Sequence, residues 1–449
     1  MPYRRLPAWA DRSFLIELKP LSDQAALYID CPNSDPHKRE ICSSDGIGSG
    51  VNILNQPATV EVNKAAIKIK KHEIIMIENG LDENDPEDGG VISATYHAVV
   101  DGLVLYPETL CAMNWVDHQR LLTCKLRVFI TEPKTFLRMG NEIISASSLE
   151  EFVANAKGQS FKVECSCCHQ RLLSSSEMKL TLLSVPSDEW LETFTSLEYF
   201  CRGCCSHSQP SSICKSDAVL SDDSFVDWKP NPERVILSFS HIFVNEESVV
   251  KNSVIHDDSQ DNLRCSKCTR ELGRIVKQYP NLYQLHNAMT SLRIGDNEDY
   301  LPSKFGSIER YLTWMLLSHC ESQTSLKLVV RTYNKRPYLL VWLLESYVIL
   351  IAGALKKIEN GVDTTMLDKC EFPCTPVLKV LYKVFDSETA LSDPRANGED
   401  ASIGIIHAPL ECCLQIIEVL LSSSEVLPPN CRTVGQFYVG FLKLNDDNN

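Results

Sequence analysis

The chain has 449 residues, and its 44 basic and 59 acidic side chains give a formal net charge of −15 at pH 7. Hydrophobic residues make up 44% and charged residues 23% of the chain, which is typical of a globular protein and excludes a wholly disordered or fibrous one. The acidic balance argues against direct binding to nucleic-acid phosphates, which requires a basic face. At roughly 150 residues per domain, the length predicts about three domains.

Cysteine is unusually frequent, with 19 residues in the chain. The first residues contain no apolar stretch long enough for a signal peptide, and no clear targeting signal is present. Cytoplasmic and nuclear thiols stay reduced, so spaced cysteines there indicate metal or catalytic sites before disulfides. We therefore expect a cytoplasmic protein, with the nucleus as a second location.

The first 145 residues are predicted to form a β-rich N-terminal domain. Apolar and polar side chains alternate in residues 59–63 and 67–70, the pattern of half-exposed strands. Asp101 and Gly102 stand between two apolar pairs, which predicts a β-hairpin with a tight turn.

Between residues 146 and 275 lies a cysteine-rich centre with three Cys-x-x-Cys pairs. The pairs are Cys165 with Cys168, Cys201 with Cys204, and Cys265 with Cys268. Two intervening residues let both thiolates of one turn reach a single Zn²⁺ at about 2.3 Å, and two such turns complete a tetrahedron. The pairs predict a structural zinc site, and the spacing leaves all three combinations of two pairs open.

Buried cysteines that act as small hydrophobic residues are the alternative interpretation. It suits Cys111, Cys320 and Cys413, which have apolar neighbours. It suits the pairs at 165–168 and 265–268 poorly, because their neighbours are polar.

The middle pair differs because Cys205 and His207 follow it in a polar stretch. Three roles are open for this cluster. It could donate ligands to the same zinc site, which the spacing favours. It could contain a reactive thiolate, since an adjacent imidazolium lowers the pKa of a thiol. It could also be an exposed loop of soft ligands that reaches the metal of a partner.

Residues 276–449 are predicted to form a C-terminal domain of mixed α and β structure. Apolar residues recur at three- and four-residue steps in residues 308–316 and 412–421, which predicts two amphipathic helices. Residues 338–355 are almost wholly apolar, but Glu345 interrupts them, and a carboxylate at the centre of a bilayer costs roughly 2.5–3.5 kcal/mol. We therefore expect two buried strand or helix segments, 338–344 and 347–352, and no membrane span.

Two histidine–cysteine neighbours in this domain are not predicted to be catalytic. His319 and Cys320 adjoin an apolar helical run, which is typical of a core pair. His407 and Cys412 flank a predicted helix start, where Pro409 suits the first turn.

Several short motifs follow one another in order along about residues 160–443. They are CSCC at 165–168, VPSDEW at 185–190, CSKC at 265–268 with LG at 272–273, LVWLL at 340–344, KVLY at 379–382 and FYVGFLK at 437–443. This ordered set resembles the HECT-like ubiquitin-conjugating-enzyme-binding family. The resemblance implies a ubiquitin-protein ligase that binds a ubiquitin-conjugating enzyme and promotes ubiquitin transfer to protein substrates.

The resemblance also implies an alternative, a non-catalytic assembly or inhibitory factor. Such a factor binds the zinc-dependent metallo-β-lactamase endonuclease of pre-mRNA 3′-end processing through the segment from Trp190 to His207. Trp190, Cys204, Cys205 and His207 match the family's nuclease-binding motif, whereas Cys201 and the inserted Ser206 depart from it.

On this resemblance the flanking pairs are left to form one Cys₄ zinc site from Cys165, Cys168, Cys265 and Cys268. A HECT-type mechanism would also need a cysteine that accepts ubiquitin as a thioester. Cys431 is the cysteine nearest the C-terminus, but no histidine or acid adjoins it and the resemblance does not mark it. We therefore assign no residue as the catalytic nucleophile and regard Cys205 as the first residue to test. The predicted fold class is α+β, with a β-rich N-terminal domain, a zinc-stapled centre and a mixed C-terminal domain.

Overall fold

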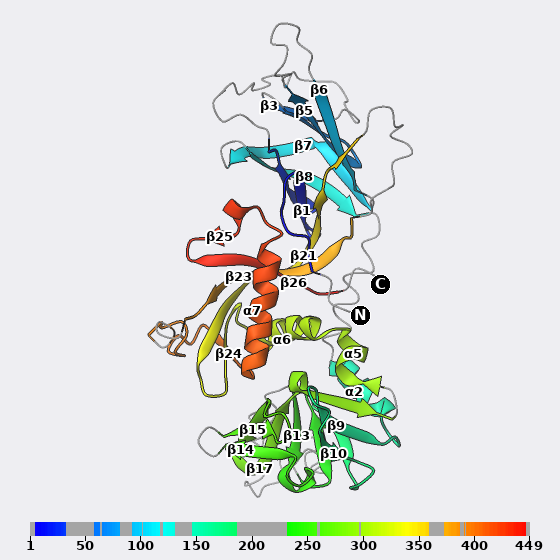
Figure 1. Cartoon of the computed structure of the whole chain (residues 1–449), viewed down its shortest axis with the longest axis vertical. Helices are drawn as coiled ribbons and strands as arrows, with labels where there is room; N and C mark the ends of the chain where they lie inside the picture. Colours follow the sequence, from blue (N-terminus) through cyan, green and yellow to red (C-terminus); the bar gives the residue numbers. More distant parts are fainter. Residues whose placement is uncertain are drawn as a thin grey trace, which may run out of the picture. The chain divides into compact units, whose positions relative to one another are not determined.

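The computed structural model describes residues 5–32, 58–62, 65–80, 92–100, 102–116, 120–130, 146–185, 231–257, 261–295, 298–358, 372–386, 390 and 392–445. Strands outweigh helices in these ranges, and their combination is compatible with the predicted α+β class (Figure 1). The chain divides into two compact units. We call residues 139–340 with 384–416 the central unit, and residues 2–138, 341–383 and 417–449 the terminal unit.

Two sheets build the terminal unit. The larger has the strand order β25-β26-β23-β21-β1-β2-β8-β7, and the smaller has the order β22-β6-β5-β4-β3. The strands of the larger sheet are β1 Ser13–Lys19, β2 Gln24–Asp30, β7 Leu103–Val116, β8 Leu121–Ile130, β21 Pro337–Ala354, β23 Thr375–Val384, β25 Thr433–Val434 and β26 Phe437–Lys443. Those of the smaller sheet are β3 Ala58–Val62, β4 Ala65–Ile69, β5 Glu73–Gly80, β6 Ile92–Val99 and β22 Lys356–Lys357. The strands predicted at 59–63 and 67–70 are confirmed as β3 and β4.

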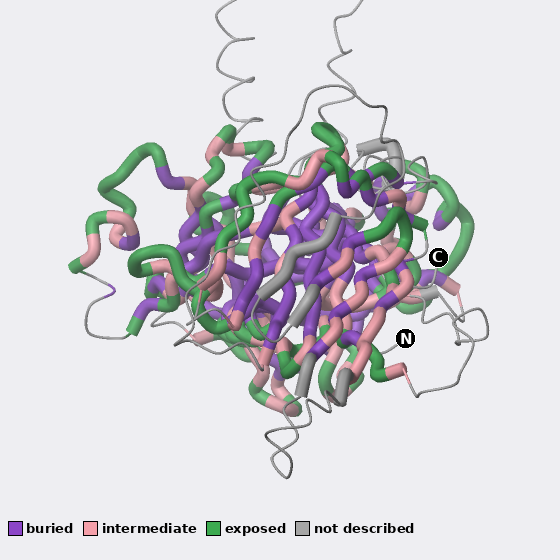
Figure 2. Tube along the Cα trace, turned by 90° about the horizontal axis from the view of Figure 1, so that it is seen from above, coloured by how far each residue is buried: buried purple, intermediate pink, exposed green. Residues whose placement is uncertain are grey.

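The larger sheet is buried on both faces around β1 and β21. Ile16 pairs with Ile351 and packs into one hydrophobic cluster, whereas the adjacent Leu15 packs with Leu350 into another cluster. Successive residues of a strand point to opposite faces, so a strand covered on both sides reads as a continuous apolar run. In Figure 2 the buried residues appear as a purple interior.

The apolar run therefore forms one strand of 18 residues, and its predicted division at Glu345 is wrong. The Glu345 carboxylate remains partly exposed and forms an ion pair with Lys19 of β1, so the strand does not end there. In the described ranges, no helix has the length and apolar character needed to cross a bilayer.

The predicted hairpin at Asp101 and Gly102 is also wrong. Asp101 lies outside the described residues, and the strands on either side belong to different sheets. β6 pairs with β5 in the smaller sheet, whereas β7 pairs with β8 in the larger one. Gly102 adopts a positive φ of 78°, and this turn carries the chain from one sheet to the other.

The central unit contains a seven-stranded sheet of order β11-β12-β13-β17-β16-β15-β14, a four-stranded sheet of order β10-β9-β18-β19 and the parallel pair β20 and β24. Its strands are β9 Phe161–Cys165, β10 Arg171–Ser174, β11 Thr181–Ser184, β12 Arg234–Leu237, β13 His241–Asn245, β14 Val254–Asp257, β15 Asn262–Cys265, β16 Glu271–Val276, β17 Tyr279–His286, β18 Thr290–Ile294, β19 Glu298–Asp299, β20 Lys327–Arg331 and β24 Gly404–His407.

Helices α2 Ala146–Asn155, α5 Tyr300–Phe305, α6 Ile308–Ser322 and α7 Leu410–Ser424 complete the fold, and α7 continues into the terminal unit. The helices predicted at 308–316 and 412–421 are thus confirmed as α6 and α7. Cys320 and Cys413 are buried as expected, but the expectation for Cys111 is wrong. Cys111 is exposed, in a part of β7 where the pairing with β8 shifts register twice.

Candidate metal centre

Two cysteine pairs of the central unit lie in tight turns of the same design. One turn leads from β9, which ends at Cys165, into β10, and the other leads from β15, which ends at Cys265, into β16. In the first turn the His169 N–H donates to the Cys165 carbonyl at 3.0 Å, and in the second the Thr269 N–H donates to the Cys265 carbonyl at 2.8 Å. His169 and Thr269 have positive φ values of 55° and 60°, a conformation that is costly for residues other than glycine and clusters at functional sites.

The two turns bring four thiols together. All four Sγ atoms lie within 4.8 Å of one another. The Sγ atoms of Cys165 and Cys268 are 3.6 Å apart, and those of Cys168 and Cys265 are 3.5 Å apart. These separations are too long for disulfides, which need about 2.0 Å. A tetrahedral Zn²⁺ with Zn–S bonds of about 2.3 Å holds its sulfur ligands about 3.8 Å apart, so the cluster fits such an ion.

The protonation of the cluster also suits a metal ligand set. Burial raises the pKa of Cys165 to about 12 and also raises the pKa of Cys265. Burial acts in the same direction on Cys268, but hydrogen bonds from the Arg270 N–H and from the other thiols lower the pKa of Cys268 to about 7. One thiolate therefore forms readily at neutral pH, and metal binding would release the remaining protons.

Arg270 ties the second turn to its surroundings in the central unit. Its Nη1 donates to Ser166 Oγ of the first turn at 2.7 Å, and its Nε donates to Glu411 Oε2 of α7 at 2.6 Å. The adjacent Leu410 N–H donates to Glu271 Oε2 at 3.1 Å. The start of α7 is thereby fixed beside the cluster.

The structure brings together the four cysteines of the predicted Cys₄ site. The other predicted site residues lie outside the described residues, so their partner-binding role stays a prediction; they are Trp190, Cys204, Cys205 and His207. Cys201, of the third Cys-x-x-Cys pair, also lies outside the described residues. Cys431 is half-buried, and burial raises its pKa, which makes it a poor nucleophile at neutral pH.

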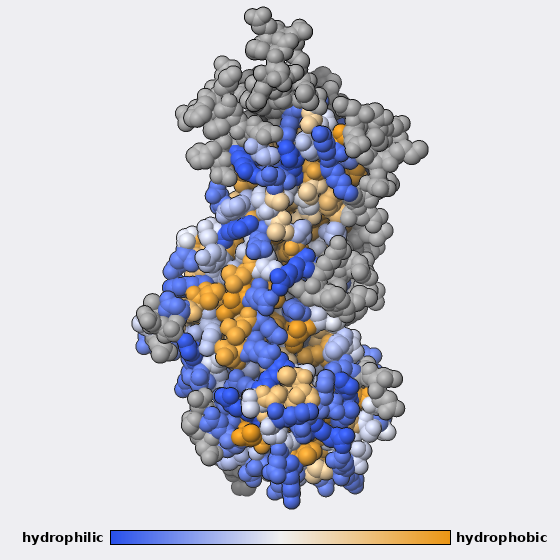
Figure 3. Space-filling view, viewed as in Figure 1, coloured by the Kyte–Doolittle hydropathy of each residue, from blue (hydrophilic) through white to orange (hydrophobic). Residues whose placement is uncertain are grey.

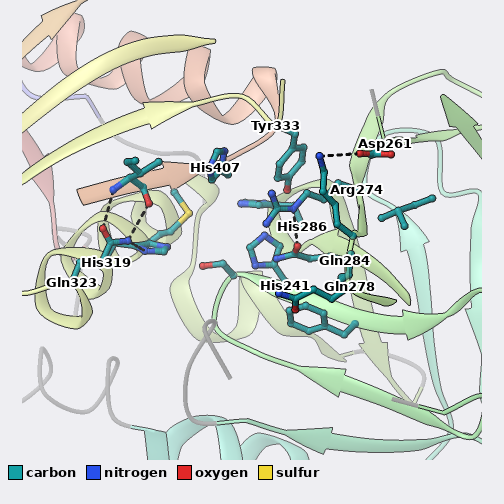
Figure 4. A pocket seen from close by; sticks show the side chains of 17 residues that line it. His241, Asp261, Arg274, Gln278, Gln284, His286, His319, Gln323, Tyr333 and His407 are labelled. Carbon is teal, nitrogen blue, oxygen red and sulfur yellow. Dashed lines mark hydrogen bonds and ion pairs between the residues drawn. The ribbon is translucent and has the colours of Figure 1, made fainter. Parts of the chain in front are cut away.

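Sequence reasoning missed a cavity of about 400 Å³ in the central unit. Figure 4 shows Arg274, Tyr333 and His286 on one side of it and His319 on the other, with His407 between them. The available signal was the end of β17, where the polar Gln284 and His286 flank the apolar Leu285 and all three residues are buried. The sequence placed His319 in the core and His407 near a helix start, and it predicted no binding role for either histidine.

Comparison with known proteins relates most of the chain to one family. The profile described as "HECT-like Ubiquitin-conjugating enzyme (E2)-binding" matches residues 123–439, which include all four clustered cysteines. The chain is 23% identical over 297 residues to a Bos taurus protein named as an E3 ubiquitin-protein ligase, an alignment that covers 62% of this chain and 72% of the relative. It is 20% identical over 293 residues to the proteins of the same name from Pongo abelii and Homo sapiens, with the same coverage. No solved structure matches the chain. The chain therefore belongs to the HECT-like ubiquitin-conjugating-enzyme (E2)-binding family.

Proposed function

We propose that the protein binds a ubiquitin-conjugating enzyme and promotes ubiquitin transfer to protein substrates. The observation that carries this proposal is the family match over residues 123–439. The name of the similar proteins, E3 ubiquitin-protein ligase, agrees with it.

Helix α7 offers a docking surface for that enzyme within the matched region. Leu410, Leu414 and Leu421 are 39%, 50% and 48% exposed. Residues spaced by four and seven positions lie on the same side of a helix, so these leucines form one apolar stripe. Apolar residues also gather around α7 on the face shown in Figure 3. Exposed apolar patches mark protein interaction sites, and the conjugating enzyme is the partner that the family description names.

The docking proposal is tested by measuring the affinity of the full chain for a panel of ubiquitin-conjugating enzymes. Replacing both Leu414 and Leu421 with aspartate should weaken binding at least about tenfold, because charges replace the centre of an apolar contact. Leu326→Asp is the matched control, since Leu326 is 59% exposed and lies outside α7. Equal affinities for all three proteins would exclude α7 as the docking surface. The absence of binding to every enzyme of the panel would contradict the proposed function itself.

Ubiquitin can pass either directly from the bound conjugating enzyme to the substrate or through a thioester on a cysteine of this chain. Outside the four-cysteine cluster, Cys111 and Cys167 are exposed, and the other described cysteines are at least partly buried. Burial raises the pKa of Cys320 and Cys413 to about 12 and that of Cys374 to about 11, so none of these thiols is a ready acceptor. Incubation with a charged conjugating enzyme and non-reducing electrophoresis distinguish the routes. Faster discharge without an adduct supports transfer by binding. A reductant-sensitive adduct that Cys205→Ala removes would instead show a thioester route through the segment outside the described residues.

We also propose that the cluster of Cys165, Cys168, Cys265 and Cys268 binds one structural Zn²⁺. The sulfur separations and the low pKa of Cys268 support this assignment. Four protein ligands leave no open coordination position, so the ion would supply folding energy and not chemistry. It would join the four-stranded sheet, through the turn after β9, to the seven-stranded sheet, through the turn after β15.

A further inference from the structure

One wall of the cavity in the central unit is a row of polar side chains on a single sheet face. The strand register places His241 of β13 opposite His286 of β17, and Gln284 of β17 opposite Arg274 of β16. Opposed residues share a face, as do residues two apart in a strand, so the four side chains lie on the same side of the sheet. His241, Gln284 and His286 are all buried there. Polar side chains that converge on one side of a cavity are typical of small-molecule sites.

Arg274 brings a cation to this wall without a matching anion. Its Nε donates to Gln284 Oε1 at 2.9 Å, and its guanidinium lies 5.3 Å from the centre of the Tyr333 ring. Among the described residues, Arg274 forms no ion pair with a carboxylate, and its two Nη groups form no hydrogen bond. Asp261 is the acidic residue of the lining, and Lys277 compensates it at 3.5 Å. The charge of Arg274 is therefore uncompensated within the cavity.

Tyr333 adds a buried donor beside this cation. The side chain is 8% exposed, yet its hydroxyl has no hydrogen-bond partner among the described residues. Burial raises its pKa, so the hydroxyl keeps its proton and can donate a hydrogen bond to an acceptor in the cavity. In Figure 4 the hydroxyl end of Tyr333 lies beside Arg274 and His286 at the cavity.

His407 of the lining contacts a second arginine, Arg331, which is not itself part of the lining. The Arg331 Nη2 lies 3.4 Å from His407 Nε2, and His407 Nδ1 lies 3.4 Å from the Thr332 carbonyl. This pattern fits a neutral imidazole that donates through Nδ1 and accepts from Arg331. Arg331 forms no ion pair with a carboxylate within the described part of the chain. Arg274 is thus an uncompensated cation of the cavity lining, and Arg331 lies behind the lining residue His407.

We propose that this cavity binds a small organic anion through its phosphate or carboxylate group. The free edge of the Arg274 guanidinium holds the oxyanion, and the Tyr333 hydroxyl donates a further hydrogen bond to it. The planar fork of arginine matches the oxygen spacing of both groups. A volume of about 400 Å³ exceeds that of a single oxyanion and is typical of small-molecule sites, so the buried histidines and Gln284 face the organic part of the ligand. The site is independent of binding to a conjugating enzyme.

The probes for this site are inorganic phosphate and succinate, each titrated into the full chain by calorimetry at constant ionic strength. The expected result is saturable binding of at least one probe in the millimolar range or tighter. Arg274→Gln should weaken it at least about tenfold, because it removes a charge-assisted pair of hydrogen bonds. Tyr333→Phe should weaken it about threefold or more through the loss of one neutral hydrogen bond. Arg171→Gln is the control, because Arg171 is an exposed arginine of the same unit that pairs with Glu177.

The titrations distinguish a specific anion site from its absence. Binding of one probe alone, with the expected losses, supports the site and identifies its anion class. Affinities that are the same in Tyr333→Phe, Arg274→Gln and wild type would overturn the assignment, as would no binding of either probe. If Arg274→Gln fails to fold, as judged by circular dichroism, Tyr333→Phe still decides, since it removes a single oxygen from the cavity wall.

Discussion

Replacing Cys265 with serine should remove one zinc ion per chain and unfold the central unit. Cys265 is fully buried, and its Sγ lies 3.5 Å from that of Cys168. Replacing this thiol with a hydroxyl therefore removes one of the four metal ligands and the contact with the Cys168 sulfur. Structural zinc sites contribute an apparent free energy of about 10–16 kcal/mol at neutral pH. Native domains are stable by only about 5–15 kcal/mol, so the loss is comparable to the whole stability of the unit.

The contacts around the cluster are too weak to replace the ion. The hydrogen bond from Arg270 to Ser166 joins the two turns directly, but a hydrogen bond to a charged group contributes only about 1.5–3 kcal/mol. Without the metal, four thiol groups, most of them protonated, would remain close together between the two sheets. We therefore expect a cooperative loss of structure and not a local change.

The assay combines metal analysis by mass spectrometry with thermal unfolding followed by circular dichroism. Cys167→Ser is a demanding control, since Cys167 is an exposed thiol of the same turn and is not one of the four clustered ligands. It should retain the wild-type zinc content and melting temperature. A Cys265→Ser protein that keeps its zinc, or loses zinc and melts like wild type, would refute the reasoning. Equal zinc loss in Cys167→Ser would show that the ligand set is wrong.

Two further predictions concern buried charges. Lys379 Nζ lies 2.7 and 2.8 Å from the two oxygens of Glu17, whose side chain is 4% exposed, so Lys379→Met should lower the free energy of unfolding in urea by about 3–5 kcal/mol. Adding Glu17→Gln should recover most of that loss, and an unchanged urea midpoint in the single variant would contradict the argument. In the central unit, burial and then the charges of Arg331 and Arg274 lower the pKa of His407 from 6.5 to about 4. The unfolded chain therefore takes up this proton first, and stability falls by at most about 3 kcal/mol as the pH drops from 6.5 to 4. His407→Gln should flatten the pH dependence of stability in that window, and a curve equal to that of wild type would count against the assigned shift.

Local patterns in the sequence were enough to predict several strands and helices and the two Cys-x-x-Cys turns. The alternation at 67–70 and the three- and four-residue steps at 308–316 depend on which face of one strand or helix is buried. The Cys-x-x-Cys spacing likewise fits a single tight turn. Such features involve residues that are close in sequence, so the chain's short-range geometry determines them.

Only the tertiary structure decided which elements meet. Cys165 and Cys268 are 103 positions apart in sequence. The Cys-x-x-Cys spacing alone did not show which two of the three pairs would meet. Gly102 could close a hairpin or, as it does, pass the chain to a second sheet, because the turn does not encode the partner of the strand that follows. Arg274 of β16 and Tyr333, in the turn after β20, line the same cavity because the folded chain brings these distant segments together. Burial and charge compensation are properties of that packing, and no stretch of neighbouring residues contains them.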